Sequence, residues 1–236
     1  MYITKIMRES NIKLNIENEG FNKFNKNLFQ LNKSEINRSF DSYFNNPKFR
    51  NNDYQNVAIL KLDDLKGTMY FEILTNIYQI FKFNNLKYSF DNLWLQESNS
   101  EYTEKKINDL PFIPHIDKKR CLKVMIYLND INQNAGPLNL VNANPENFEK
   151  MRQGLDFDYK KKKQNVVSSI PIEKYISCEG NFGTSIFFDT NTPHFAGQIS
   201  DDASFRRILR FTFLKSNNNF DKIRNIFKKF RFKVKI

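Results

Sequence analysis

Residues 112–128 read FIPHIDKKRCLKVMIYL, and residues 183–199 read GTSIFFDTNTPHFAGQI. In both stretches, short apolar runs rich in β-branched and aromatic residues are interrupted by Pro, Asn, Asp and Gly. This pattern is typical of short strands joined by turns. We therefore expect strands at 112–117, 121–128, 183–188 and 194–199.

The flanking sequence extends this pattern in both directions. Further strands are expected at 56–62, 87–97, 136–141 and 205–214. Apolar residues at helical spacing predict two helices, at 35–44 with Ser34 as its cap and at 66–82, and Asn144–Pro145 is a helix-start signal. The polar, Asn-rich first ~30 residues indicate a loosely held arm. Helices first and many short strands afterwards favour a mostly β fold, a sandwich or jelly roll, with N-terminal helices packed on it.

The bulk composition limits the class of protein. The chain has 236 residues, 15% of them aromatic, which is enough for a packed core without disulfides or a structural metal. We find no firm boundary and treat 1–236 as a single domain with its core at about 55–215. Cys121 and Cys178 have no metal-binding or redox spacing, and we expect a reducing, cytoplasmic setting, with one disulfide between them as the alternative. No secretory signal and no membrane-spanning run is recognised, and the oligomeric state is not readable.

The formal net charge is +11, and three kinds of partner could account for it. They are nucleic acid, an anionic membrane surface and an acidic small substrate. Composition alone, which is dense in Lys, Asn and Ile, explains the charge equally well. Because no nucleic-acid-binding motif is present, we expect no nucleic-acid partner. Lys160–Lys163 forms a basic run, and the basic tail 216–236 has apolar residues at helical spacing, so a C-terminal basic helix is expected.

The chain has two histidines, and both belong to the candidate site. His115 stands two residues before Asp117, so on a strand both side chains point to the same face and can reach one ion. His194 follows the apolar run FF and the turn DTNTP, and it is the only candidate for a second imidazole. Two imidazoles and one carboxylate form the facial triad of oxygen-activating Fe(II) enzymes. A short H-x-D motif alone is weak evidence, because a lone histidine is more often bonded to a neighbour.

The wider context of these residues resembles a known superfamily. The string PHIDKKRCLKVMIYLNDINQNAGPLNLV, followed by GTSIFFDTNTPHFAGQISDDASFRRILRFTF, is similar to the Fe(II)/2-oxoglutarate-dependent oxygenases. The similarity is greatest to their phytanoyl-CoA dioxygenase and prolyl-hydroxylase branches. Four elements occur in the same order: the H-x-D, an apolar strand before a Gly-led strand, a G-x-x-x-F-F-D run, and a distal His followed by Arg. The resemblance covers roughly residues 90–215.

The resemblance implies a double-stranded β-helix of jelly-roll type and a set of site residues. Fe(II) would be held by His115, Asp117 and His194, with 2-oxoglutarate as co-substrate. The far carboxylate of 2-oxoglutarate would bind an arginine after the distal histidine. The implied co-substrate contacts are Arg206 as first choice, Arg210 as the alternative on the same strand face, Thr212 and Tyr127. Arg207 should point to the opposite face.

The resemblance also implies a reaction class. Relatives that halogenate replace the carboxylate ligand by a small residue, and Asp117 is retained here, so hydroxylation of an aliphatic C–H bond by dioxygen is expected. The substrate would be a small molecule, for which the positive charge suggests an anion. Trp94, Gln96 and Tyr102 could line its entrance. Two alternatives stay open: a cupin-like metal enzyme that does not use 2-oxoglutarate, and a basic binding protein without enzymatic activity.

Overall fold

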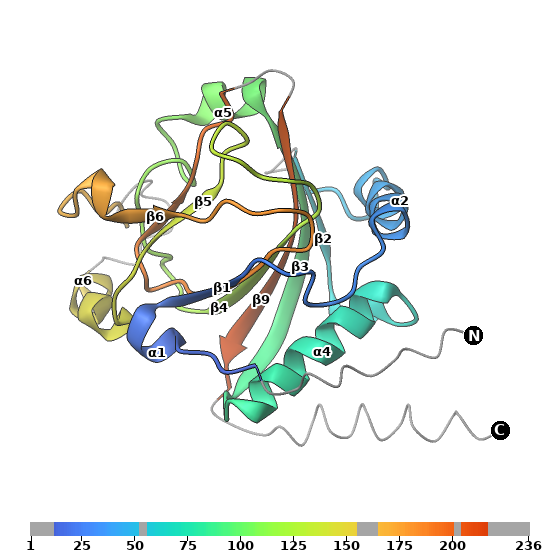
Figure 1. The fold of residues 1–236 in the computed structure, drawn as a ribbon, viewed down its shortest axis with the longest axis horizontal. Coiled ribbons are helices and arrows are strands. Elements are labelled where there is room, and N and C mark those ends of the chain that lie inside the picture. The colour runs from blue at the N-terminus through green and yellow to red at the C-terminus, as the bar shows by residue number, and fades with distance from the viewer. Residues whose placement is uncertain (1–11, 52–55, 155–164, 201–203, 217–236) are drawn as a thin grey trace.

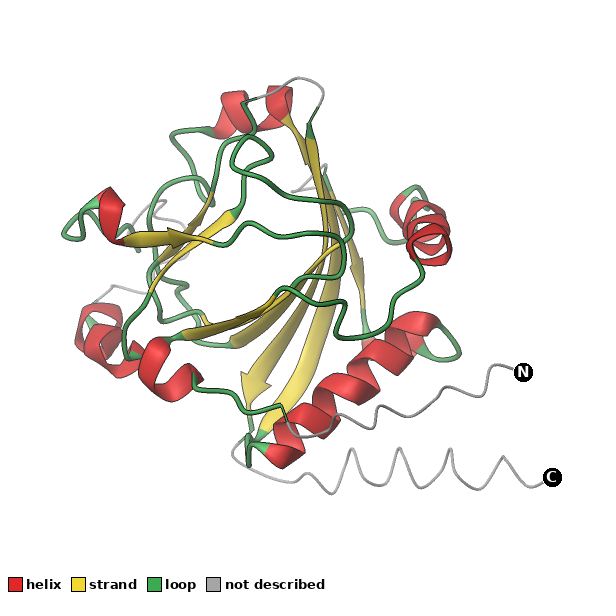
Figure 2. Cartoon of the chain, viewed as in Figure 1, coloured by secondary structure: helices red, strands yellow, loops and turns green. Residues whose placement is uncertain are grey.

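Two antiparallel sheets contain the named strands of the protein, whose computed structural model describes residues 12–51, 56–154, 165–200 and 204–216 (Figures 1 and 2). The larger sheet has the strand order β1-β7-β4-β9-β3-β2, and the smaller has the order β6-β5-β8. The large-sheet strands are β1 (Phe21–Phe24), β2 (Val57–Leu60), β3 (Tyr88–Asn99), β4 (Leu122–Tyr127), β7 (Ser185–Asp189) and β9 (Phe205–Lys215). The small-sheet strands are β5 (Leu138–Val141), β6 (Tyr175–Ser177) and β8 (His194–Ala196).

The helices lie mainly before and between these strands. They are α1 (Ile16–Glu19), α2 (Lys33–Phe44), α3 (Leu62–Leu65), α4 (Met69–Phe83), α5 (Ser100–Lys106) and α6 (Glu149–Gln153), with the short 3₁₀ turns η1 (Pro145–Phe148) and η2 (Ile172–Lys174). Helices α2 and α4 lie along the outer side of the large sheet, and the small sheet lies on its other side (Figure 1). A mostly β chain with N-terminal helices is therefore confirmed.

Side chains along the central strands of the large sheet alternate between two apolar clusters, one on each face of the sheet. On β4, Leu122, Val124 and Ile126 join the cluster that contains the buried faces of α2 and α4. Met125 and Tyr127 join the second cluster, together with residues of β5 such as Leu138 and Leu140. Because successive strand side chains point to opposite faces, one strand supplies both the helix-side core and the space between the sheets.

The expected helices are present, with corrected starting points. Helix α2 begins at Lys33, because Asn32, not Ser34, is its cap: Asn32 Oδ1 accepts the backbone N–H groups of Ser34 and Glu35. The predicted helix at 66–82 is α4 at Met69–Phe83, preceded by the separate short helix α3. Gly67 lies between them with a φ of 76°, a left-handed conformation that interrupts a helix.

The described part of the first thirty residues is not a loose arm, and this expectation was wrong. Strand β1 pairs with β7 at the edge of the large sheet, and Ile12, Leu28 and Phe29 are buried. The Asn side chains that made the segment look unstructured serve the backbone instead. Asn27, for example, donates to the carbonyl of Leu31 at 2.8 Å and accepts the N–H of the same residue at 2.9 Å.

Residues 112–117 are not a regular strand either. His115 makes only isolated bridges, to Val166 and to His194. Pro111 and Pro114 have no N–H to donate, so a continuous ladder cannot form through this segment. The H-x-D motif therefore lies on a segment that follows Pro114 and precedes β4. The remaining expected strands are present, with ends shifted by a few residues.

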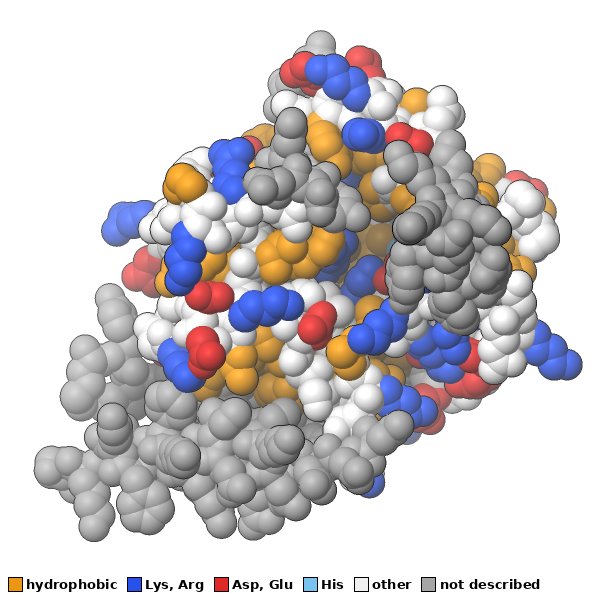
Figure 3. All heavy atoms as spheres, turned by 180° about the vertical axis from the view of Figure 1, so that it is seen from behind, with side chains coloured by type: hydrophobic (Ala, Val, Ile, Leu, Met, Phe, Trp, Pro, Cys, Tyr) orange, Lys and Arg blue, Asp and Glu red, His pale blue; other side chains and the backbone are white. Residues whose placement is uncertain are grey.

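The remaining expectations concern the basic segments, membrane spans, the two cysteines and the surface charge. The basic run Lys160–Lys163 and the tail 217–236 lie outside the described residues. Within the described ranges, no helix has the length and apolar character needed to span a bilayer. Cys121 and Cys178 are buried and unpaired with each other. On the face in Figure 3, Lys and Arg side chains of described residues are scattered among Asp and Glu.

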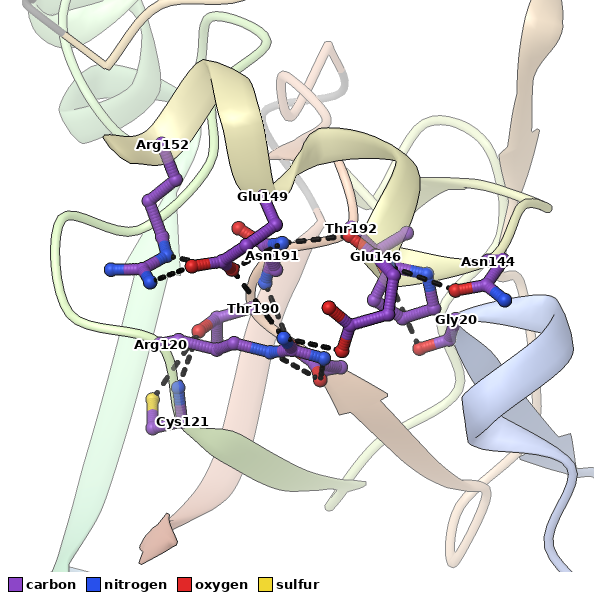
Figure 4. A network of polar contacts seen from close by, with 12 residues as sticks. Gly20, Arg120, Cys121, Asn144, Glu146, Glu149, Arg152, Thr190, Asn191 and Thr192 are labelled. Carbon is purple, nitrogen blue, oxygen red and sulfur yellow. Dashed lines mark hydrogen bonds and ion pairs between the residues drawn. The ribbon is translucent and has the colours of Figure 1, made fainter. Parts of the chain in front are cut away.

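A polar network joins the segment that follows His115 to the turn that precedes His194 (Figure 4). Arg120 donates to both oxygens of Asp189 through Nε, at 2.9 and 3.2 Å, and its Nη2 lies 2.8 Å from Asp189 Oδ2. Its Nη1 reaches Glu146 at 2.7 Å and Glu149 at 3.4 Å. Asn191 donates to Glu149 at 3.2 Å, so the turn after β7 is fixed to the helical segment η1–α6.

We predict that Asp189→Asn destabilises the fold far more than Glu146→Gln, although both residues pair with Arg120. The Asp189 side chain is 5% exposed and that of Glu146 is 62% exposed. Weakening a largely buried ion pair should lower the free energy of unfolding by about 2 kcal/mol or more, whereas an exposed pair contributes about 0–1 kcal/mol. Urea unfolding of both variants measures the difference, and equal losses would contradict a structural role for Asp189.

Candidate metal centre

Three side chains from the two segments converge at one point. His115, Asp117 and His194 each offer one ligand atom, and these atoms lie within 4.8 Å of one another. Asp117 Oδ1 is 3.8 Å from His115 Nε2 and 3.7 Å from His194 Nε2. Within the described ranges, this is the one group of three or more His, Cys, Asp or Glu side chains arranged closely enough to hold an ion.

Main-chain pairing brings these residues together. The N–H of His115 donates to the carbonyl of His194 at 3.0 Å, and the N–H of His194 donates back to His115 at 2.8 Å. The N–H of Asp117 donates to the carbonyl of Thr190 at 3.0 Å. Residues nearly eighty positions apart are thus paired directly at the site, which sequence spacing alone does not show.

Each imidazole is oriented by a backbone carbonyl. His115 Nδ1 donates to the carbonyl of Ile113, and His194 Nδ1 donates to that of Thr192, both at 2.8 Å. A carbonyl can only accept, so each neutral ring has its proton on Nδ1 and its lone pair on Nε2. Burial lowers the pKa of His115, and burial together with the neighbouring His115 lowers that of His194 to about 3. Both rings are therefore neutral at pH 7.

The two carboxylate oxygens of Asp117 have different partners. Its Oδ1 faces the two Nε2 atoms, while Oδ2 accepts a hydrogen bond from Lys123 Nζ at 2.5 Å. Burial alone would raise the pKa of Asp117, but the charge of Lys123 and the neighbouring histidines outweigh it and leave that pKa below its usual value. Lys123 is not among the site residues predicted from the sequence. The sequence does contain a signal for it: Lys123 is a charged residue inside the apolar strand CLKVMIYL. It lies on the same strand face as Met125 and Tyr127.

The donor set fits a divalent first-row metal. Two Nε2 lone pairs and one carboxylate oxygen face a common point, and the second oxygen of the carboxylate is held away by Lys123. Three protein donors on one side leave positions of an octahedral ion open to other ligands. The arrangement therefore suits a catalytic rather than a closed structural site.

The three side chains open into a cavity of about 260 Å³. Trp94, Gln96 and Tyr102 line it, as expected from the sequence. Apolar wall residues include Met125, Leu138, Phe188 and Ile208, and the other described wall residues are Asn56, Val57, Leu110, Pro111, His115, Asp117, Lys123, Asn165, His194, Ala196, Arg206 and Arg210.

Arg206 and Arg210 both face this cavity, and Arg207 faces away from it. Arg206 is 3% exposed, and its Nη1 donates to the carbonyl of Gly136. Burial lowers its pKa, although a guanidinium stays charged in proteins. Arg207 instead pairs with Glu97 on the helix side of the sheet. The predicted strand parity is confirmed.

Two expected co-substrate residues lie outside the cavity wall. Tyr127 is fully buried, and its hydroxyl donates to the carbonyl of Cys178 at 2.9 Å while accepting the N–H of Leu138 at 3.2 Å. It joins the large sheet to β5. Thr212 lies opposite Lys123 in the β4–β9 register, beyond the described cavity wall. Neither residue is among the described residues that line the cavity.

Comparisons with known proteins agree with this geometry. The family model described as "Phytanoyl-CoA dioxygenase (PhyH)" matches residues 30–208. No match was found among curated proteins. Solved structures with the same fold include EvdO2 from Micromonospora carbonacea var. aurantiaca, with 13% identity and a TM-score of 0.53, covering 88% of this chain and 93% of that one.

Two further neighbours were solved with a metal bound, one of them together with the co-substrate. The epimerase SnoN, solved with Fe³⁺, α-ketoglutarate and nogalamycin RO, has 13% identity and a TM-score of 0.56, covering 85% of this chain and 80% of that one. EctD from S. alaskensis, with bound Fe, has 10% identity and a TM-score of 0.56, covering 88% and 78%. These likenesses show the fold, and the family model spans well over half of the chain. The chain therefore belongs to the phytanoyl-CoA dioxygenase family.

Proposed function

We propose that this protein is an Fe(II)- and 2-oxoglutarate-dependent oxygenase that hydroxylates an aliphatic C–H bond of a small molecule. The observation that carries the proposal is the convergence of two Nε2 atoms and Asp117 Oδ1 on a cavity whose wall also contains a buried arginine. The two facing antiparallel sheets support the double-stranded β-helix expected for such enzymes.

The protein residues have separate roles in this proposal. His115, Asp117 and His194 would hold the iron, and the two carbonyl-bound Nδ1 groups would keep both rings in the binding tautomer. Lys123 would keep Asp117 ionised and bound through one oxygen. Arg206 would bind the far carboxylate of 2-oxoglutarate, because a buried guanidinium lining a cavity favours an anionic partner.

When bound, the iron and 2-oxoglutarate would supply the oxidation itself: dioxygen would provide one oxygen atom to succinate and one to the product hydroxyl, and the C1 carboxyl group of 2-oxoglutarate would leave as CO₂. The apolar wall of Met125, Phe188 and Ile208 would restrict water around the reacting C–H bond. The remaining wall residues would orient the substrate.

Retention of Asp117 favours hydroxylation over halogenation. A halide would need the coordination position that this carboxylate fills, and the negative charge of Asp117 disfavours a further anionic ligand. The Lys123 contact also favours hydroxylation, because it fixes the carboxylate at the site rather than leaving it free to rotate away.

Arg206→Leu is predicted to lose 2-oxoglutarate binding while keeping metal binding. Removing one partner of a buried charge-assisted pair costs about 2–5 kcal/mol, which is at least about thirtyfold in Kd. Arg207→Leu is the matched control, since Arg207 is the next residue on β9 and pairs with Glu97 away from the cavity. Calorimetric titration of 2-oxoglutarate into the Mn(II)-loaded variants measures the difference. Equal affinity in the two variants would refute the role of Arg206.

The function itself is tested by following 2-oxoglutarate turnover. Fe(II)-loaded protein incubated with 2-oxoglutarate under ¹⁸O₂ should form succinate that contains one ¹⁸O atom, even slowly and without the true substrate. Iron binding without any succinate would instead favour a cupin-like enzyme that does not use 2-oxoglutarate. Failure to bind any divalent metal would favour a binding protein without this activity.

A further inference from the structure

The main chain of Asn165 is held against the H-x-D motif of the candidate metal centre. The N–H of Ile116, the middle residue of that motif, donates to the carbonyl of Asn165 at 3.1 Å. The next residue, Val166, makes a backbone bridge to His115. Asn165 therefore has a fixed position beside two of the three candidate ligands, His115 and Asp117.

The side-chain amide of Asn165 has one polar atom that is bonded and one that is not. Its Nδ2 donates to the carbonyl of Ile116 at 2.5 Å, and because a carbonyl can only accept, this bond fixes the orientation of the amide. Its Oδ1 is buried and has no hydrogen-bond partner among the described residues. Asn165 is 4% exposed and lines the cavity of about 260 Å³. A buried acceptor without a partner is unfavourable, so a ligand in the cavity that brings a donor group would satisfy it.

A second asparagine of the cavity wall, Asn56, does not give the same information. Its Oδ1 is also buried without a partner among the described residues, and its Nδ2 donates to Ser98 Oγ at 3.2 Å. A hydroxyl can both donate and accept, so this contact is compatible with either orientation of the Asn56 amide. Asn165, whose orientation is fixed, is the asparagine from which a property of the ligand follows.

We infer that Asn165 is a specificity-determining residue, whose Oδ1 accepts a hydrogen bond from a hydroxyl or N–H group of the substrate. Because Asn165 lies beside the metal ligands, this donor group is close to the carbon that is oxidised. The inference rests on the proposed function and names a property of the substrate class for the same site. It excludes hydrocarbons, and also ethers, esters and tertiary amides without a donor, because these would leave the buried Oδ1 unpaired.

Proton relaxation by a paramagnetic metal tests the inference without knowledge of the true substrate. Two pairs of probes differ by one methyl group that removes the donor: 2-methoxyethanol against 1,2-dimethoxyethane, and N-methylacetamide against N,N-dimethylacetamide. Each is titrated into protein loaded with Mn(II) and 2-oxoglutarate. In at least one pair, the donor probe should bind beside the metal about fivefold or more tightly than its methylated counterpart. The pair with the larger ratio identifies a hydroxyl or an N–H.

Asn165→Ala assigns the preference to one side chain. The variant lacks Oδ1, so the two probes of a pair should bind it with equal affinity. Asn139→Ala is the matched control and should keep the wild-type ratio. The amide of Asn139 also donates to a backbone carbonyl, that of Pro137, and Asn139 is not among the described residues that line the cavity.

The ratio within a pair is independent of a general change in metal affinity. Mn(II) and 2-oxoglutarate binding are measured in the same samples, and a weaker metal site would affect both probes of a pair alike. If Asn165→Ala does not retain Mn(II), Asn165→Leu, which has a side chain of similar volume without an acceptor, takes its place. The comparison of probes on the wild-type protein does not depend on either variant.

The opposing outcomes are distinguishable. Equal affinities within both pairs on wild-type protein, with Mn(II) and 2-oxoglutarate bound, would overturn the inference alone. A donor preference that persists in Asn165→Ala, or that is lost equally in Asn139→Ala, would also overturn it, because the preference would then not depend on Asn165. Absence of Mn(II) binding in the wild-type protein would overturn the proposed function and this inference together.

Discussion

The reciprocal pairing of the His115 and His194 main chains is the constraint on which the site depends. The two N–H groups and two carbonyls exchange hydrogen bonds, so the two rings are fixed with their centroids 4.4 Å apart. Asp117 reaches the same point because its own N–H is held by Thr190, and Arg120 and Asp189 keep the two segments together from behind. The site is therefore built by backbone pairing first and by side chains second.

The large sheet serves the core and the site at once. On β9, Leu209, Phe211 and Phe213 pack toward the helices, while Arg206 and Arg210 alternate with them and face the cavity. The same division holds on β4, where Lys123 lies between two core residues. Cations are tolerated on the inner face because each has an assigned anionic or aromatic neighbour: Asp117 for Lys123, Trp94 for Arg210, and the proposed co-substrate for Arg206.

Local patterns predicted much of this from sequence. Strand parity placed Arg206 and Arg210 together and Arg207 apart, and two lone histidines with one H-x-D were enough to nominate the three candidate ligands. Parity could not reveal that Tyr127 uses its hydroxyl to join two strands, since that depends on a carbonyl fifty-one residues away. The strand expected at 112–117 was wrong because its prolines prevent a ladder. Strand β1 was missed because its partner β7 lies far along the chain. Lys123 was overlooked because a single lysine in an apolar strand gives no sign of which charge it faces.

The central claim is that one Fe(II) ion binds His115, Asp117 and His194 together. Anaerobic calorimetric titration of Fe(II) into the wild-type protein and the variants His115→Ala, Asp117→Ala and His194→Ala tests it most directly. We expect one ion per chain in the wild type, loss of tight binding in both histidine variants, and weak residual binding in Asp117→Ala, where two imidazoles remain. Wild-type stoichiometry and affinity in all three variants would contradict the account.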